Sequence, residues 1–306
     1  MSTVTEYLHR DALNTLRTIA PERKDRFREE FDRLNISFVF DTDAQRIRFA
    51  ADLAQKTVII GPQCLDRLWA ICFAYYRFYR AIADHKLSGR PERSLDLRST
   101  PELREAGDLL KWAVESDLAG KRKEQGPPWP AHLPRPSPNV AHASDEHCAT
   151  ELFLCAVAFL LHHEFAHLRM AHSPYSELES VDAILQEKEA DFEAAAWILG
   201  ELPDELAPMF QKRALGVGLG LVWIASLYVY AETKIEHTTH PPAYDRLFQV
   251  MEKHIHDGGN LPWAFVQSVL ALHLQNQGIP HDADREFESF KDAADHFVDV
   301  ISKMFR

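Results

Sequence analysis

TELFLCAVAFLLHHEFAH, residues 150–167, is the stretch that decides the fold of this 306-residue chain. Its apolar residues recur at positions i, i+3, i+4 and i+7, which predicts a helix with one buried face. His163 and His167 continue that face. Because side chains four residues apart project from the same side of a helix, the two imidazoles can bind one metal ion in the interior.

Glu164 lies three residues before the second histidine. Its carboxylate can flank an ion held by His163 and His167 without binding it, which is the position of a general base in the pattern His-Glu-x-x-His. A pair of hydrogen-bonded core histidines is the alternative explanation of the same residues. We assign no role to His162, which lies about 100° around the helix, or to His172 near the helix end.

A third ligand is expected on the following helix, because two histidines leave the coordination of a zinc ion incomplete. The segment EKEAD, residues 187–191, supplies the candidates. Glu187 and Asp191 share a face with small and apolar residues, whereas Glu189 lies on the polar face. Helical phase therefore favours Glu187 as the ligand. Asp191, one turn later, can accept the ring N–H of a liganding histidine and fix its tautomer.

The two segments together resemble the gluzincin type of zinc metallopeptidase, in which two histidines on one helix and a glutamate on the next bind the metal. His167 is followed after 19 residues by Glu187 in the pattern ExxAD. Length, helical character and the mid-chain motif most resemble the bacterial phage-exclusion peptidase (Lit-like) family. The resemblance covers about residues 150–250. It implies a zincin-like core, a Zn²⁺ cofactor and a cytoplasmic protease directed at a translation elongation factor.

HPPAYDRL, residues 240–247, is similar to the His-Pro segment that follows the zinc site in several gluzincin families. The resemblance implies that His240 stabilises the oxyanion during catalysis. It also implies that Arg246 pairs with an internal carboxylate. The alternative is that the histidine and its two prolines simply begin a helix.

The rest of the chain predicts a mainly α (α+β) protein with many helices and a small N-terminal β-meander. The meander is expected from three β-rich runs at residues 36–40, 46–49 and 57–60. Helices are expected at about 63–83, 101–119, 149–172, 179–200, 203–231, 243–256, 262–276 and 282–304. We divide the chain into an N-terminal helical region with the meander (1–125), a Pro-rich loop (126–139), a zinc peptidase core (140–256) and a C-terminal helical extension packed on the core (257–306).

Composition limits the partners and the compartment. A formal charge of −12, from 46 acidic and 34 basic residues, repels polyanions and argues against a nucleic-acid partner. Four cysteines without close spacing predict buried free thiols, and residues 1–24 lack the apolar stretch of a secretory signal, so we expect a cytoplasmic protein. The uncharged stretch 214–231 reaches the lower length limit of a membrane span. A buried central helix explains that stretch equally well, and we do not expect a membrane partner.

These residues predict a zinc-dependent endopeptidase that acts on a protein or peptide substrate. His163, His167 and Glu187 would bind Zn²⁺, and Glu164 would take a proton from the attacking water and pass it to the leaving amine. Two alternatives stay open. One is a catalytically inactive, zinc-stabilised regulatory binding protein, and the other is a latent peptidase that needs an activating partner, with the Pro-rich loop over its cleft. The sequence does not specify the oligomeric state.

Overall fold

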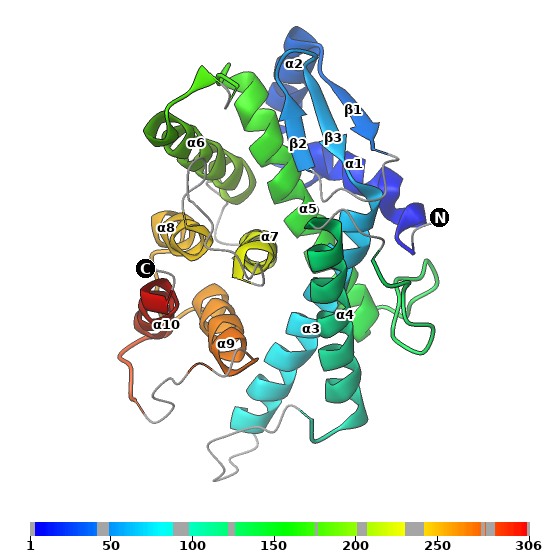
Figure 1. Cartoon of the computed structure of the whole chain (residues 1–306), viewed down its shortest axis with the longest axis vertical. Coiled ribbons are helices and arrows are strands. Elements are labelled where there is room, and N and C mark those ends of the chain that lie inside the picture. The colour runs from blue at the N-terminus through cyan, green and yellow to red at the C-terminus, as the bar shows by residue number, and fades with distance from the viewer. Residues whose placement is uncertain are drawn as a thin grey trace.

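The computed structural model describes residues 4–41, 49–87, 98–121, 126–174, 177–200, 207–229, 242–276, 279 and 285–304. These residues form a mainly helical protein with one small sheet, which confirms the expected fold class (Figure 1). The first part of the chain forms η1 (Glu6–Leu8), α1 (His9–Thr18), η2 (Pro21–Arg23), α2 (Lys24–Leu34), β1 (Ser37–Phe40), β2 (Phe49–Asp52) and β3 (Thr57–Ile60). The helices that follow are α3 (Pro62–Leu87), α4 (Pro101–Lys121), α5 (Asp145–Arg169), α6 (Ser180–Leu199), α7 (Ala207–Val229), α8 (Ala243–His254), α9 (Leu261–Asn276) and α10 (Phe290–Met304).

Helix α5 is the centre of the fold and carries the two candidate histidine ligands. It packs against α1, α3, α6 and α7, and most of its side chains are buried. The helix begins at Asp145 because the Ser144 hydroxyl accepts a hydrogen bond from the backbone N–H of His147 at 3.2 Å. This cap starts the helix one turn before the expected residue 149.

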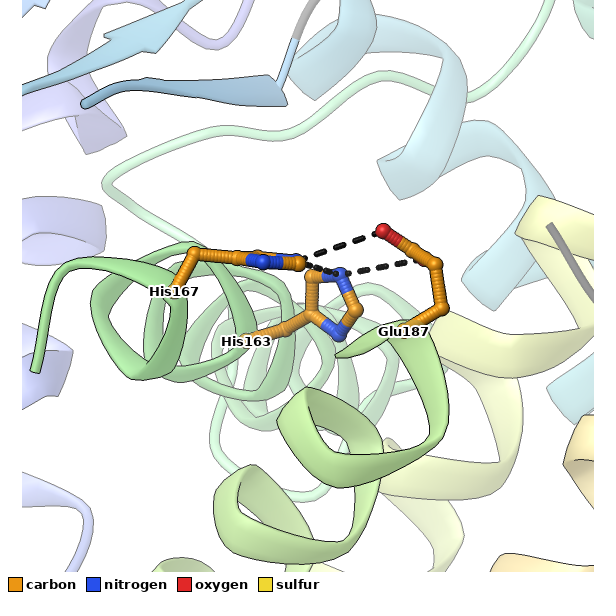
Figure 2. Close-up of side chains that lie close together, drawn as sticks. All are labelled: His163, His167 and Glu187. Atoms are coloured by element: carbon orange, nitrogen blue, oxygen red, sulfur yellow. Dashed lines mark hydrogen bonds and ion pairs between the residues drawn. The ribbon is translucent and has the colours of Figure 1, made fainter. Parts of the chain in front are cut away.

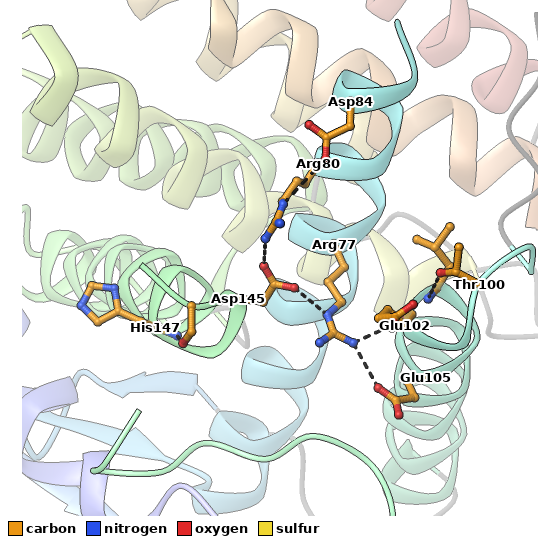
Figure 3. Close-up of polar contacts among 10 residues, drawn as sticks. Arg77, Arg80, Asp84, Thr100, Glu102, Glu105, Asp145 and His147 are labelled. Atoms are coloured by element: carbon orange, nitrogen blue, oxygen red, sulfur yellow. Dashed lines mark hydrogen bonds and ion pairs between the residues drawn. The ribbon is translucent and has the colours of Figure 1, made fainter. Parts of the chain in front are cut away.

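Two arginines on α3 tie the start of α5 to its neighbours (Figure 3). Arg77 donates through Nε to the Asp145 carboxylate at 2.9 Å and through Nη1 to Glu105 of α4 at 3.1 Å. Arg80 donates to the other carboxylate oxygen of Asp145. A carboxylate in the first turn also complements the positive end of the helix dipole. These contacts fix the position of α5 relative to the long pair α3 and α4.

Glycines let α7 approach α5 closely. A Cβ atom on Gly216 would lie 2.1 Å from Cβ of Cys155, and one on Gly220 would lie 3.1 Å from the Phe159 ring. Over its described part, the uncharged stretch 214–231 is therefore a core helix, and two of its glycines face α5. The C-terminal helices α8, α9 and α10 pack together on the other side of α7 (Figure 1).

One described helix has the length and apolar content of a membrane span. Within the described ranges, the helix that is long and apolar enough to cross a membrane is α5, not α7. Of its apolar window, 72% is buried inside the structure. Burial of most of this window by other helices and the sheet accounts for the high apolar content of α5.

The small sheet is not a meander, which corrects that part of the prediction. Its strand order is β1-β3-β2, with β1 parallel and β2 antiparallel to β3. The second strand lies at Phe49–Asp52 rather than at 46–49, and residues 42–48 lie outside the described part of the chain. Strand β3, the central strand, is largely buried, whereas β1 at the edge alternates with exposed side chains.

The Pro-rich loop packs on α3 and α4. The Trp129 ring lies 4.6 Å from Trp112 and 6.0 Å from Trp69, and Trp112 Nε1 donates to the carbonyls of Pro127 and Pro128 at 3.1 and 3.0 Å. These contacts make the loop part of the α3–α4 surface. All four cysteines are free, as expected, and Cys148 is the one that is partly exposed.

Replacing Gly216→Ala should destabilise the protein, because the new methyl group would overlap the side chain and backbone of Cys155. Overpacking of this kind costs about 1–3 kcal/mol. Gly107→Ala is the matched control, since its Cβ would find its nearest neighbour, Phe78, at 4.0 Å. That change should stabilise α4 slightly through helix propensity. Urea unfolding of both variants measures the difference, and equal stabilities would contradict the close packing of α5 and α7.

Candidate metal centre

Three side chains from two neighbouring helices meet in the interior beside the sheet (Figure 2). His163 and His167 project from α5, and Glu187 projects toward them from α6. All three are buried, with exposures of 5%, 5% and 1%. The antiparallel return of α6 after α5 is what brings the glutamate opposite the histidines, as its helical phase predicts.

The spacing of the donor atoms fits one small cation. The two Nε2 atoms lie 3.2 Å apart, and Glu187 oxygens lie 3.6 Å from Nε2 of His163 and 3.3 Å from Nε2 of His167. A tetrahedral zinc ion with bonds of about 2.0–2.1 Å has donor atoms about 3.3–3.4 Å apart. Among the described residues this group contains three candidate donors. Three donors leave one coordination position for solvent or substrate.

Asp191 lies against His163, which is where its predicted role in orienting a liganding histidine would require it. Its Oδ1 atom lies 2.9 Å from Nδ1 of His163, so the ring nitrogen that faces away from Glu187 has a carboxylate acceptor. Burial opposes protonation of His163, but the charges of Glu187 and Asp191 outweigh it and raise the pKa of the ring to about 8. The same charges would attract a metal cation.

Arg246 of α8 holds both carboxylates from the far side. It donates to the two Asp191 oxygens at 2.6 and 2.8 Å, and its Nη2 lies 3.2 Å from Oε2 of Glu187. Burial alone would raise the pKa of Asp191, but the guanidinium and the hydrogen bond with His163 hold it below its ordinary value. The predicted pairing of Arg246 with an internal carboxylate is therefore present, and it involves two carboxylates.

Glu164 lies between the helix and the sheet. Burial raises the pKa of its carboxyl group, and the nearby rings of His163 and His167 offset part of that rise. A hydrogen bond with the backbone of Ala51 in β2 also favours the charged form. Sequence reasoning did not identify Ala51, because a backbone donor leaves no trace in residue type.

The structure describes one of two other histidines, His162, but not His240. His162 packs on the Trp197 ring at 5.5 Å and edge-on to Phe27 at 5.8 Å, and burial lowers its pKa to about 3. It is a neutral core residue, consistent with the absence of an assigned role. His240 lies outside the described residues, so its predicted contribution to the site stays a prediction.

His172 is a site residue that sequence reasoning missed. The sequence assigned it no role, but its side chain is buried, and its Nδ1 lies 2.8 Å from Nδ1 of His167. Its Nε2 lies 3.4 Å from Oε2 of Glu189 on α6. The sequence does not show this contact, because it depends on a left-handed backbone at Ala171, where no glycine signals the turn.

Comparison with known proteins identifies the family of the chain. The family model described as Peptidase U49 matches residues 58–266, which include His163, His167 and Glu187. A relative named "Cell death peptidase" from Escherichia coli (strain K12) is 31% identical over 233 residues, which cover 75% of this chain and 75% of the relative. No solved structure matches the chain. The two matches confirm the resemblance drawn from the sequence, and the chain therefore belongs to the Peptidase U49 family and is a peptidase.

Proposed function

We propose that the protein is a zinc-dependent endopeptidase whose metal ligands are His163, His167 and Glu187. The observation that carries the proposal is the spacing of 3.2–3.6 Å among the three donor groups, close to the edges of a zinc coordination tetrahedron. Two imidazoles and one carboxylate with an open fourth position are a donor set typical of catalytic zinc. A structural zinc site would need a fourth protein ligand, which the described residues do not supply.

The chain supplies the groups for peptide hydrolysis around that centre. Zinc bound there would polarise the scissile carbonyl and bring the pKa of water toward about 7. Glu164 accepts the proton of the attacking water and returns it to the leaving amine nitrogen. The backbone of Ala51 orients the Glu164 carboxylate toward this task. Asp191 holds the proton on Nδ1 of His163, which leaves Nε2 free to bind metal.

Strand β2 offers a binding surface for an extended peptide. It is an edge strand of the sheet, packs against α5, and hydrogen-bonds through Ala51 to Glu164. A substrate segment that paired with this edge would bring its backbone carbonyl close to the general base. The edge strand is therefore our reason for proposing cleavage within a protein chain.

The physiological role is proposed from likeness. The E. coli relative bears the name cell death peptidase, and we propose that this protein also cleaves a protein of its own cell, in the cytoplasm. By the resemblance to phage-exclusion peptidases, the proposed target is a host translation factor cleaved in phage defence. In the alternative form of this proposal, the protein is a latent peptidase that is active only when an activating partner binds.

The first test replaces Glu164→Gln, which keeps the size of the side chain but removes the base. We expect bound zinc to be unchanged and peptide cleavage to fall about 10²–10⁴-fold. Mapping new protein N-termini after expression of the wild type beside this variant measures the cleavage and identifies the substrate. Equal sets of new N-termini at equal rates would contradict the role of Glu164.

The second test concerns the metal. His163→Ala removes a donor, and Glu187→Gln replaces the charged carboxylate with a neutral amide oxygen that binds zinc more weakly, so we expect both variants to lose tightly bound zinc and cleavage together. Glu193→Gln is the matched control on the same helix, because Glu193 pairs with Arg169 and not with the centre. Metal analysis of the purified proteins, with chelator treatment and zinc re-addition for the wild type, checks this. Full zinc content in His163→Ala would exclude this ligand set.

A further inference from the structure

We propose that His172 is a positioning residue that holds the ring of His167 for metal binding, and that Glu189 supports it from α6. The inference deepens the proposed function and rests on the metal centre proposed above. Its starting point is the distance of 2.8 Å between the two Nδ1 atoms, both of which are buried.

The backbone at the end of α5 places His172 there. The N–H of His172 donates to the carbonyl of His167 at 3.1 Å, and the N–H of Ala171 donates to the carbonyl of Leu168 at 3.4 Å. These two bonds form a Schellman turn, which folds the chain back over the last turn of the helix. Ala171 has a φ of 54°, a conformation that favours glycine, so the contacts around the turn must hold it in place.

The ring contact determines where the protons lie when His167 binds metal. Metal binding through Nε2 leaves Nδ1 as the ring nitrogen of His167 that carries a proton. At 2.8 Å that N–H faces Nδ1 of His172, which can accept the hydrogen bond only when it carries no proton, so the proton of neutral His172 lies on Nε2. Nε2 of His172 faces Glu189 at 3.4 Å, long for a hydrogen bond, so Glu189 is the weaker support.

Helix α6 also holds the residue after His172. The side-chain amide of Gln186, next to the ligand Glu187, lies 3.1 Å from the carbonyl and 3.2 Å from the amide nitrogen of Ser173 in the orientation that satisfies both groups. The turn that carries His172 is thus bound to the helix that carries the third ligand. His163 and His167 are oriented by different partners, a clamped carboxylate for one and a second imidazole for the other.

A matched pair of substitutions tests the inference. His172→Asn keeps an acceptor, because its Oδ1 atom takes the place of Nδ1, whereas His172→Leu has similar size and no acceptor. Competition with a chromophoric chelator measures the zinc affinity of each folded variant, checked by circular dichroism. We expect His172→Leu to raise the Kd for zinc about 10–100-fold, and His172→Asn to recover most of the affinity.

The cobalt-substituted protein gives a second readout that does not depend on cleavage. We expect the visible absorption bands of Co²⁺ to shift in His172→Leu and to return in His172→Asn, with a smaller effect in Glu189→Gln. Equal zinc affinity and equal spectra in all variants would overturn the role of His172 while the metal centre stands. Equal losses of zinc affinity in the Asn and Leu variants would show that His172 acts through packing and not as a hydrogen-bond acceptor, which would also overturn the inference. A wild-type protein that binds no zinc would overturn both proposals.

Discussion

The structure depends on a buried ion pair between Arg246 and two carboxylates, Asp191 and Glu187. Removing a carboxylate from water costs several kcal/mol, so two of them at 1% exposure require a fixed positive partner. Arg246 supplies it with a planar group that binds both oxygens of Asp191. Because the three residues come from α6 and α8 and face α5, the ion pair fixes the relative positions of three helices. The distances among the candidate ligands follow from that packing.

The remaining fold keeps this arrangement rigid. Gly216 and Gly220 let α7 pack directly on α5, and Arg77 and Arg80 hold the start of α5 against α3 and α4. The histidines lie near the other end of the same helix, so a helix fixed along its length presents them with little freedom. A site built on packed helices in this way is more accurately positioned than one built on loops. The positions of the side chains in the centre therefore depend on the packing of the core.

The sequence predicted correctly which side chains of a single helix face the interior, because the helical period alone determines this. The phase of α6 separates Glu187, which faces the histidines, from Glu189 on its more exposed side, and the structure places them so. The sequence did not predict contacts between segments that are far apart in the chain. The pairing of β1 with β3 instead of β2 is a long-range choice, and nothing within either strand specifies it. His172 was missed because a left-handed alanine, invisible to residue-type rules, turns its ring inward.

The two histidines of the centre are held in chemically different ways, and this has a consequence for metal binding. His163 faces a carboxylate that Arg246 fixes, so its ring carries more negative charge and stays in place. His167 faces a neutral ring on a turn at the end of the helix, which is a weaker and more adjustable support. In the proposed zinc enzyme, His163 and Glu187 would hold the ion beside Glu164, and the position of His167 would depend on the contact with His172. The two histidines therefore have separate supports, and a change in one support should leave the other in place.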